Sequence, residues 1–85
     1  MRIKTMSDEE RIAILEKSFD FLEQIIQEAY VEDDEAKTRE NILKVAKKIF
    51  EKSKSELDRL ALKDALEKLD DFSFMDIAEI YDSLN

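Results

Sequence analysis

The side chains that could do chemistry in this chain are carboxylates, lysines and hydroxyls. The 85 residues include 22 Asp and Glu and 14 Lys and Arg, but no His, Cys, Gly or Pro. Without histidine the commonest general base near neutral pH is missing, and without histidine and cysteine the usual zinc ligands are missing as well. Phosphate-binding and dinucleotide-binding loops need glycines. We therefore expect no enzyme activity, no catalytic residue, no cofactor and no bound metal.

Two acidic runs are the places where a hard cation would bind, residues 32–35 and the pair Asp70 and Asp71. Calcium takes oxygen ligands, but an EF-hand loop also needs a glycine and regularly spaced acids. Neither run has these features. The pattern favours solvated turns that cap helices.

Five lysines between residues 44 and 54 could form a phosphate-binding stripe. Acidic residues are interleaved with them, and the net charge of the chain is −8. We expect no nucleic-acid partner. The lysines are instead expected to lie beside the acids of a neighbouring helix.

The charge of the chain is unevenly distributed. Residues 7–35 carry a net charge of −9, residues 36–68 carry +4, and residues 69–85 carry −5. Charge of one sign steers partners of the opposite sign, but it also simply keeps small domains soluble. The sequence leaves open whether the acidic flanks are functional or only solubilising.

These charged residues must be positioned by helices, of which residues 12–30 give the clearest pattern. Two apolar stripes lie side by side at helical spacing. The first is Ile12, Leu15, Phe19, Leu22, Ile26, Ala29 and Tyr30, and the second is Ile14, Phe21 and Ile25. An apolar surface this wide must be covered on two sides, so we expect this helix to be central.

Capping signals place the helices at residues 8–31, 35–53, 56–70 and 74–84. Ser7 and Glu10 have capping-box spacing, and residues 1–6 are expected to be a tail. The second helix is expected to bury Ile42, Leu43, Val45, Ala46, Ile49 and Phe50. The prediction is an all-α fold, a small antiparallel helical bundle of four helices in a single domain over residues 1–85. It would have three helices if the break near Ser53 to Ser55 is only a kink, in which case residues 35–70 form one kinked helix.

The function expected of such a chain is a small acidic protein-interaction module without catalysis, such as an adaptor, inhibitor or regulatory subunit with a protein partner. The alternative is an acidic mimic or immunity-type inhibitor that occupies a basic nucleic-acid-binding site of a partner protein. Salt would weaken the second kind of complex steeply through screening. No signal-peptide pattern and no membrane-spanning run occurs in the sequence, so we expect a cytoplasmic protein without membrane contact.

A homodimer is favoured slightly over a monomer by the second stripe, because a contiguous apolar patch often marks an interface and a self-complementary patch closes a two-fold dimer. Aromatic and methionine side chains near the C-terminus add candidates, since both are enriched at interfaces. The predicted interface residues are Ile14, Phe21, Ile25, Phe74, Met75 and Tyr81.

Overall fold

The computed structural model describes residues 7–85, so the predicted tail, residues 1–6, lies outside the described residues. Four helices follow one another along the chain: α1 (Asp8–Ala29), α2 (Glu35–Lys52), α3 (Glu56–Asp71) and α4 (Phe74–Leu84). The predicted all-α bundle of four helices is confirmed. The largest boundary difference is at the end of α1, predicted at residue 31 and found at Ala29. None of the described helices is long and apolar enough to cross a membrane.

Side-chain caps fix the helix starts. The hydroxyl of Ser7 accepts a hydrogen bond from the backbone N–H of Glu10 at 3.2 Å, and the Glu10 carboxylate accepts one from the backbone N–H of Ser7. Ser73 and Asp76 form the same reciprocal pair at the start of α4. Asp34 caps α2 by accepting from Lys37 N–H at 2.9 Å. These caps satisfy backbone donors that the first helical turn leaves without partners.

The break between α2 and α3 is complete, so residues 35–70 form two helices. The hydroxyl of Ser53 donates to the carbonyl oxygen of Ile49 at 2.7 Å where α2 ends. Two residues later the hydroxyl of Ser55 accepts from Asp58 N–H at 3.1 Å and starts α3. Local hydrogen bonds of serine thus compete with continuation of the helix.

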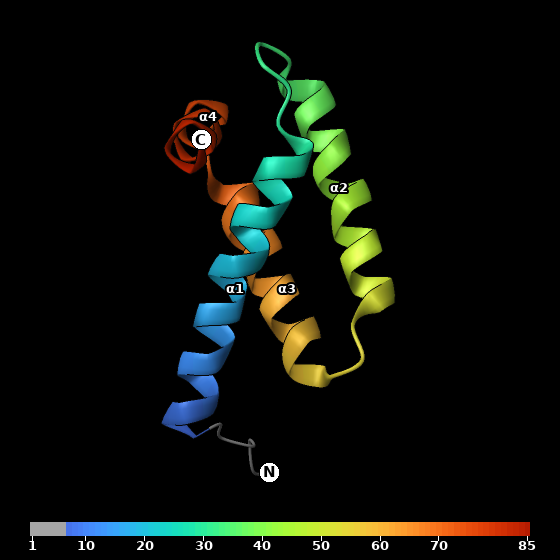
Figure 1. Cartoon of the computed structure of the whole chain (residues 1–85), viewed down its shortest axis with the longest axis vertical. Coiled ribbons are helices and arrows are strands. Elements are labelled where there is room, and N and C mark those ends of the chain that lie inside the picture. The colour runs from blue at the N-terminus through green and yellow to red at the C-terminus, as the bar shows by residue number, and fades with distance from the viewer. Residues whose placement is uncertain (1–6) are drawn as a thin grey trace.

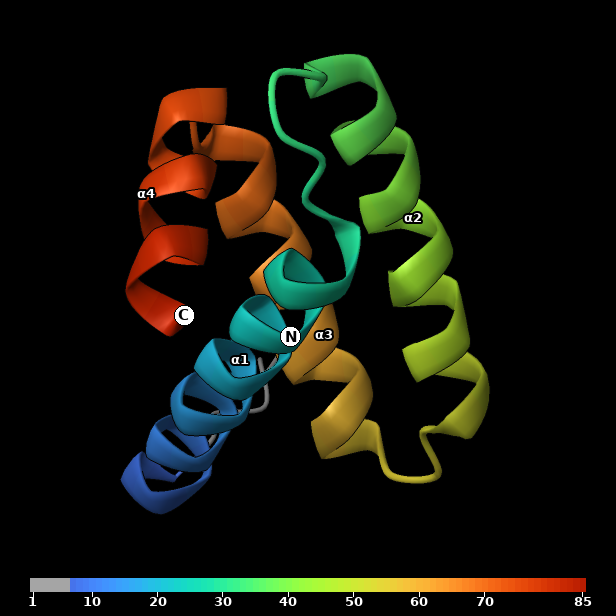
Figure 2. The ribbon, with the colours of Figure 1, turned by 45° about the horizontal axis from the view of Figure 1, so that its top comes forward.

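The helices form a bundle in which α1 contacts each of the other three (Figure 1). α1 and α3 run in the same direction and α2 runs in the opposite one (Figure 1 and Figure 2), and the three helices all contact one another. α4 lies beside the C-terminal ends of α1 and α3 and is seen end-on in Figure 1. The predicted central place of α1 is confirmed.

The most extensive contact joins α1 to α3. Ser18 of α1 and Ala61 and Ala65 of α3 are completely buried. Because the distance between helix axes depends on the side chains at the contact, small residues allow α1 and α3 to approach closely. Ser18, a polar residue outside both predicted stripes, is therefore part of the buried face of α1.

The buried face of α1 differs from the predicted one. Leu22 and Ile26 of the first stripe are buried as expected, and so are Phe21 and Ile25 of the second. Phe21 and Ile25 lie in the core of the single chain, which leaves them almost no exposed surface for the predicted interface. The physical reason is that α2, α3 and α4 surround the C-terminal half of α1 on more than one side.

The N-terminal half of α1 is in a different situation, because the other helices leave part of its apolar surface uncovered. Its members of the first stripe are exposed: Ile12 by 54%, Leu15 by 47% and Phe19 by 53%. We call these three residues the α1 stripe. They were predicted to be core residues, and that prediction is wrong.

α2 also buries a narrower face than predicted. Ile42, Val45, Ala46 and Ile49 are buried, whereas Leu43 is 68% exposed and Phe50 is 53% exposed. The predicted pairing of α2 lysines with α1 acids is not observed either. Each of the four ion pairs between described residues joins side chains three or four positions apart in one helix.

Candidate functional site

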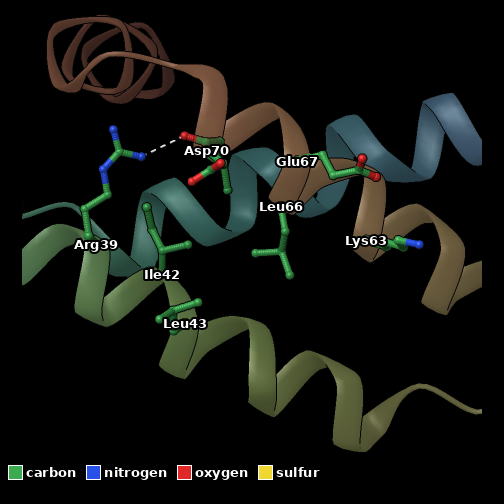
Figure 3. Close-up of a pocket in the computed structure, with 8 residues that line it drawn as sticks. Arg39, Ile42, Leu43, Lys63, Leu66, Glu67 and Asp70 are labelled. Carbon is green, nitrogen blue, oxygen red and sulfur yellow. Dashed lines mark hydrogen bonds between the residues drawn. The ribbon is translucent and has the colours of Figure 1, made fainter.

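An open groove between α2 and α3 is the candidate site (Figure 3). It has a volume of about 370 Å³. Its lining residues are Arg39, Ile42 and Leu43 from α2, and Lys63, Leu66, Glu67, Leu69 and Asp70 from α3. Figure 3 shows Ile42, Leu43 and Leu66 pointing into the space between the two helices. The floor of the groove is therefore apolar and its rim is charged.

Arg39 holds one end of this groove in place. Its guanidinium donates two hydrogen bonds of 2.7 Å, one to the carbonyl oxygen of Leu69 and one to that of Phe72. These carbonyls lie at the C-terminal end of α3, where helical carbonyls lack intrahelical partners. The charge of Arg39 also interacts favourably with the negative end of the α3 dipole. Arg39 thus ties the start of α2 to the turn before α4.

Exposed apolar surface continues from the groove along α2. Leu43 and Phe50 are seven residues apart and therefore lie on the same side of the helix. The guanidinium of Arg59 lies over the Phe50 ring, 5.5 Å from its centroid. Lys47, which is exposed, lies between Leu43 and Phe50 in sequence. This end of the groove is bordered by basic side chains.

A cluster of serine, aspartate and lysine lies where α1 crosses α3. The hydroxyl of Ser18 donates to Asp64 Oδ2 at 2.7 Å, and Lys68 Nζ donates to the same oxygen. The hydrogen bonds from Lys68 and then Ser18 hold the pKa of the Asp64 carboxyl below its ordinary value. A carboxylate with a lowered pKa is a weak general base. The Ser18 hydroxyl is also out of reach of a substrate, because Ser18 is completely buried. The cluster joins two helices and does not present a nucleophile to a substrate.

The predicted interface residues near the C-terminus are divided between core and surface. Tyr30 contacts Phe74 and Tyr81, with ring centroids 5.7 and 4.7 Å apart. Burial, and then the carboxylates of Glu32 and Asp82, raise the pKa of the Tyr30 phenol. Phe74 and Tyr81 are half-buried, so their rings serve mainly to pack α4 against the end of α1.

Met75 and Ile14 complete the set of predicted interface residues. Met75 is 70% exposed and is the member of the set with a free surface, whereas Ile14 is half-buried against the core. The structure does not bring the six predicted residues together on one surface.

The exposure of Leu43, which lines the groove, and of Phe50, further along α2, was missed because the sequence pattern assigned both residues to the buried face of the second helix. The signal that could have found them is the width of the apolar face of the second helix. Ile42, Val45, Ala46 and Ile49 already form a sufficient stripe for one buried face, so Leu43 and Phe50 fall outside it. Within residues 7–85, no group of three or more carboxylates is arranged to hold a metal ion.

Comparison with known proteins gives no match: no protein-family model fits the chain, and no curated protein or solved structure is significantly similar to it.

Proposed function

We propose that this chain is a protein-interaction module without catalytic activity, an adaptor, inhibitor or regulatory subunit, which binds an amphipathic helix of a protein partner in the groove between α2 and α3. The observation that carries the proposal is the exposure of Leu43 and Phe50 beside an apolar groove. Exposed apolar surface of this kind, bordered by charged residues, is typical of interaction sites.

A helix suits the groove better than a small molecule does. Pockets for small ligands enclose most of the ligand and present a few converging polar groups. Here the groove is open, and the guanidinium of Arg39 is already bonded to two backbone carbonyls. An amphipathic helix would place side chains at positions i, i+3 or i+4, and i+7 into such a groove.

The non-catalytic part of the proposal is supported by the residues present. The sequence contains neither His nor Cys, and the Asp64 carboxylate is occupied by Ser18 and Lys68. The groove itself contains no hydroxyl or thiol nucleophile among its lining residues. Its charged side chains, Lys63, Glu67 and Asp70, surround apolar residues. An apolar centre with a polar rim is typical of protein–protein interfaces.

The test compares the wild type with two variants in purification from the native host. Leu43→Glu places a charge at the groove, and Met75→Glu is the matched control, because the two residues are exposed by 68% and 70%. We expect a partner that is recovered equally by the wild type and Met75→Glu and is reduced about tenfold or more by Leu43→Glu, which corresponds to about 1.4 kcal/mol.

Equal recovery of every partner by all three proteins would refute the proposed groove. The salt dependence of the purified complex separates this function from the acidic mimic. A complex made through the apolar groove should weaken only slightly as ionic strength rises, whereas a mimic of a nucleic-acid backbone would lose affinity steeply.

A further inference from the structure

We propose that the groove between α2 and α3 accepts the α1 stripe of a second copy of this chain, so that copies associate head to tail. This inference rests on the proposed function, because it uses the same groove, and it names the partner. The anchors are Ile12, Leu15 and Phe19, whose spacing of three and then four residues is that of a helix bound in a groove.

The α1 stripe is exposed on the N-terminal half of α1. Ile12, Leu15 and Phe19 are each about half exposed, at 54%, 47% and 53%. The same seam becomes buried further along α1, at Leu22 and Ile26. The exposed segment is therefore a rigid, preformed amphipathic helix, and binding it would not require folding of a disordered segment.

Acidic side chains border the α1 stripe. Asp8 and Glu16 each lie four residues from Ile12, and Glu23 lies four residues from Phe19, so these carboxylates are surface neighbours of the anchors. Two basic side chains also border the stripe: Arg11 lies four residues from Leu15, and Lys68 Nζ lies over the Phe19 ring, 5.4 Å from its centroid. Residues 8–23 contain six acids and two bases. The N-terminal half of α1 thus combines three apolar anchors with an excess of negative charge.

The groove is complementary at the end near Phe50. Lys47 lies four residues from Leu43 and three from Phe50, Arg59 contacts the Phe50 ring, and Lys63 is on the groove rim. Glu67 and Asp70 lie on the rim toward the C-terminal end of α3, which places the acidic helix nearer Phe50. Opposite charges around matching apolar surfaces fix orientation and partner choice.

The arrangement of the helices makes the contact intermolecular. No residue of α1 lines the groove between α2 and α3, so the α1 stripe does not fill the groove of its own chain. The contact uses two different surfaces, and a heterologous contact of this kind produces rings or open chains of copies. The lengths agree, since residues 8–23 span about 24 Å and α2 about 27 Å at 1.5 Å per residue.

The experiment is a complementation test by light scattering and sedimentation from micromolar to millimolar concentration. The average mass of the wild type is expected to rise above the monomer mass of 10.0 kDa as concentration increases. Leu15→Glu places a charge in the α1 stripe, and Leu43→Glu places a charge in the groove. Each variant has lost one of the two contact surfaces, so each alone should remain monomeric. An equimolar mixture should form a 1:1 complex of twice the monomer mass, because Leu15→Glu retains an intact groove and Leu43→Glu retains an intact α1 stripe.

Three results would overturn the proposal: a wild type that remains monomeric throughout, association of either single variant to the wild-type extent, or a mixture that does not associate. Circular dichroism verifies folding, and Phe19→Glu and Phe50→Glu replace any variant that fails to fold. Met75→Glu should associate like the wild type. A monomeric wild type together with a partner lost by Leu43→Glu would refute self-association and leave the proposed function standing.

Discussion

Leu22→Ala and Leu15→Ala form a matched pair that tests the assigned core of α1. Both leucines belong to the same predicted stripe, seven residues apart, yet Leu22 is 3% exposed and Leu15 is 47% exposed. The change removes three carbon atoms, which at about 0.8 kcal/mol each is about 2.4 kcal/mol when the side chain is fully buried. The cavity left in a packed core raises the cost for Leu22→Ala to about 3 to 4 kcal/mol. Leu15→Ala leaves no enclosed cavity and should cost about 1 kcal/mol.

The measurement is urea unfolding followed by circular dichroism, at low micromolar concentration so that association does not contribute to stability. Glu23→Ala, at an exposed position of the same helix, is the neutral control and should lie within about 0.5 kcal/mol of the wild type. If Leu22→Ala and Leu15→Ala agree within about 0.5 kcal/mol, then the two halves of α1 are equally buried and the reasoning is refuted.

Three further predictions concern polar contacts. Asp64→Asn should lower the free energy of unfolding at neutral pH. Because folding lowers the pKa of the Asp64 carboxyl, the carboxylate stabilises the fold fully above the ordinary pKa of 3.8, and this stabilisation is lost as pH falls through the lower pKa of the folded state. The difference in urea midpoint from the wild type should therefore be constant near pH 6 and shrink below about pH 4, and a constant difference down to about pH 2 would contradict this. Arg39→Met should cost about 2 kcal/mol of stability, because the hydrogen bonds to two backbone carbonyls are lost. Amide exchange in α4 should become faster, and unchanged exchange would show that Arg39 does not hold the turn before α4 in place. Ser7→Ala should cost about 1 kcal/mol and speed exchange of the Glu10 amide, whereas unchanged protection would place the helix start elsewhere.

The sequence alone determined the order of the helices and nearly all of their ends, whereas the structure decided that residues 35–70 form two helices and not one kinked helix. These features depend on contacts between residues close together in the chain. The pairing of Ser7 with Glu10, the capping by Ser55 and the capping by Ser73 each act over three residues, so the pattern of residue types is enough to locate them. The exclusion of histidine and cysteine chemistry also needed only the composition.

Only the tertiary structure decided which apolar residues are core. Helical periodicity reports the direction of a side chain around the helix axis, but it does not report whether another helix lies in that direction at that height. Leu15 and Leu22 lie on the same side of α1, and they differ because the other helices cover Leu22 and leave Leu15 about half exposed. Leu43 and Phe50 are exposed for a similar reason, since the groove between α2 and α3 is open beside them. Ser18 is buried where α1 packs against α3, and Asp64, 46 residues later, accepts a hydrogen bond from its hydroxyl. That contact depends on how two helices separated in sequence meet.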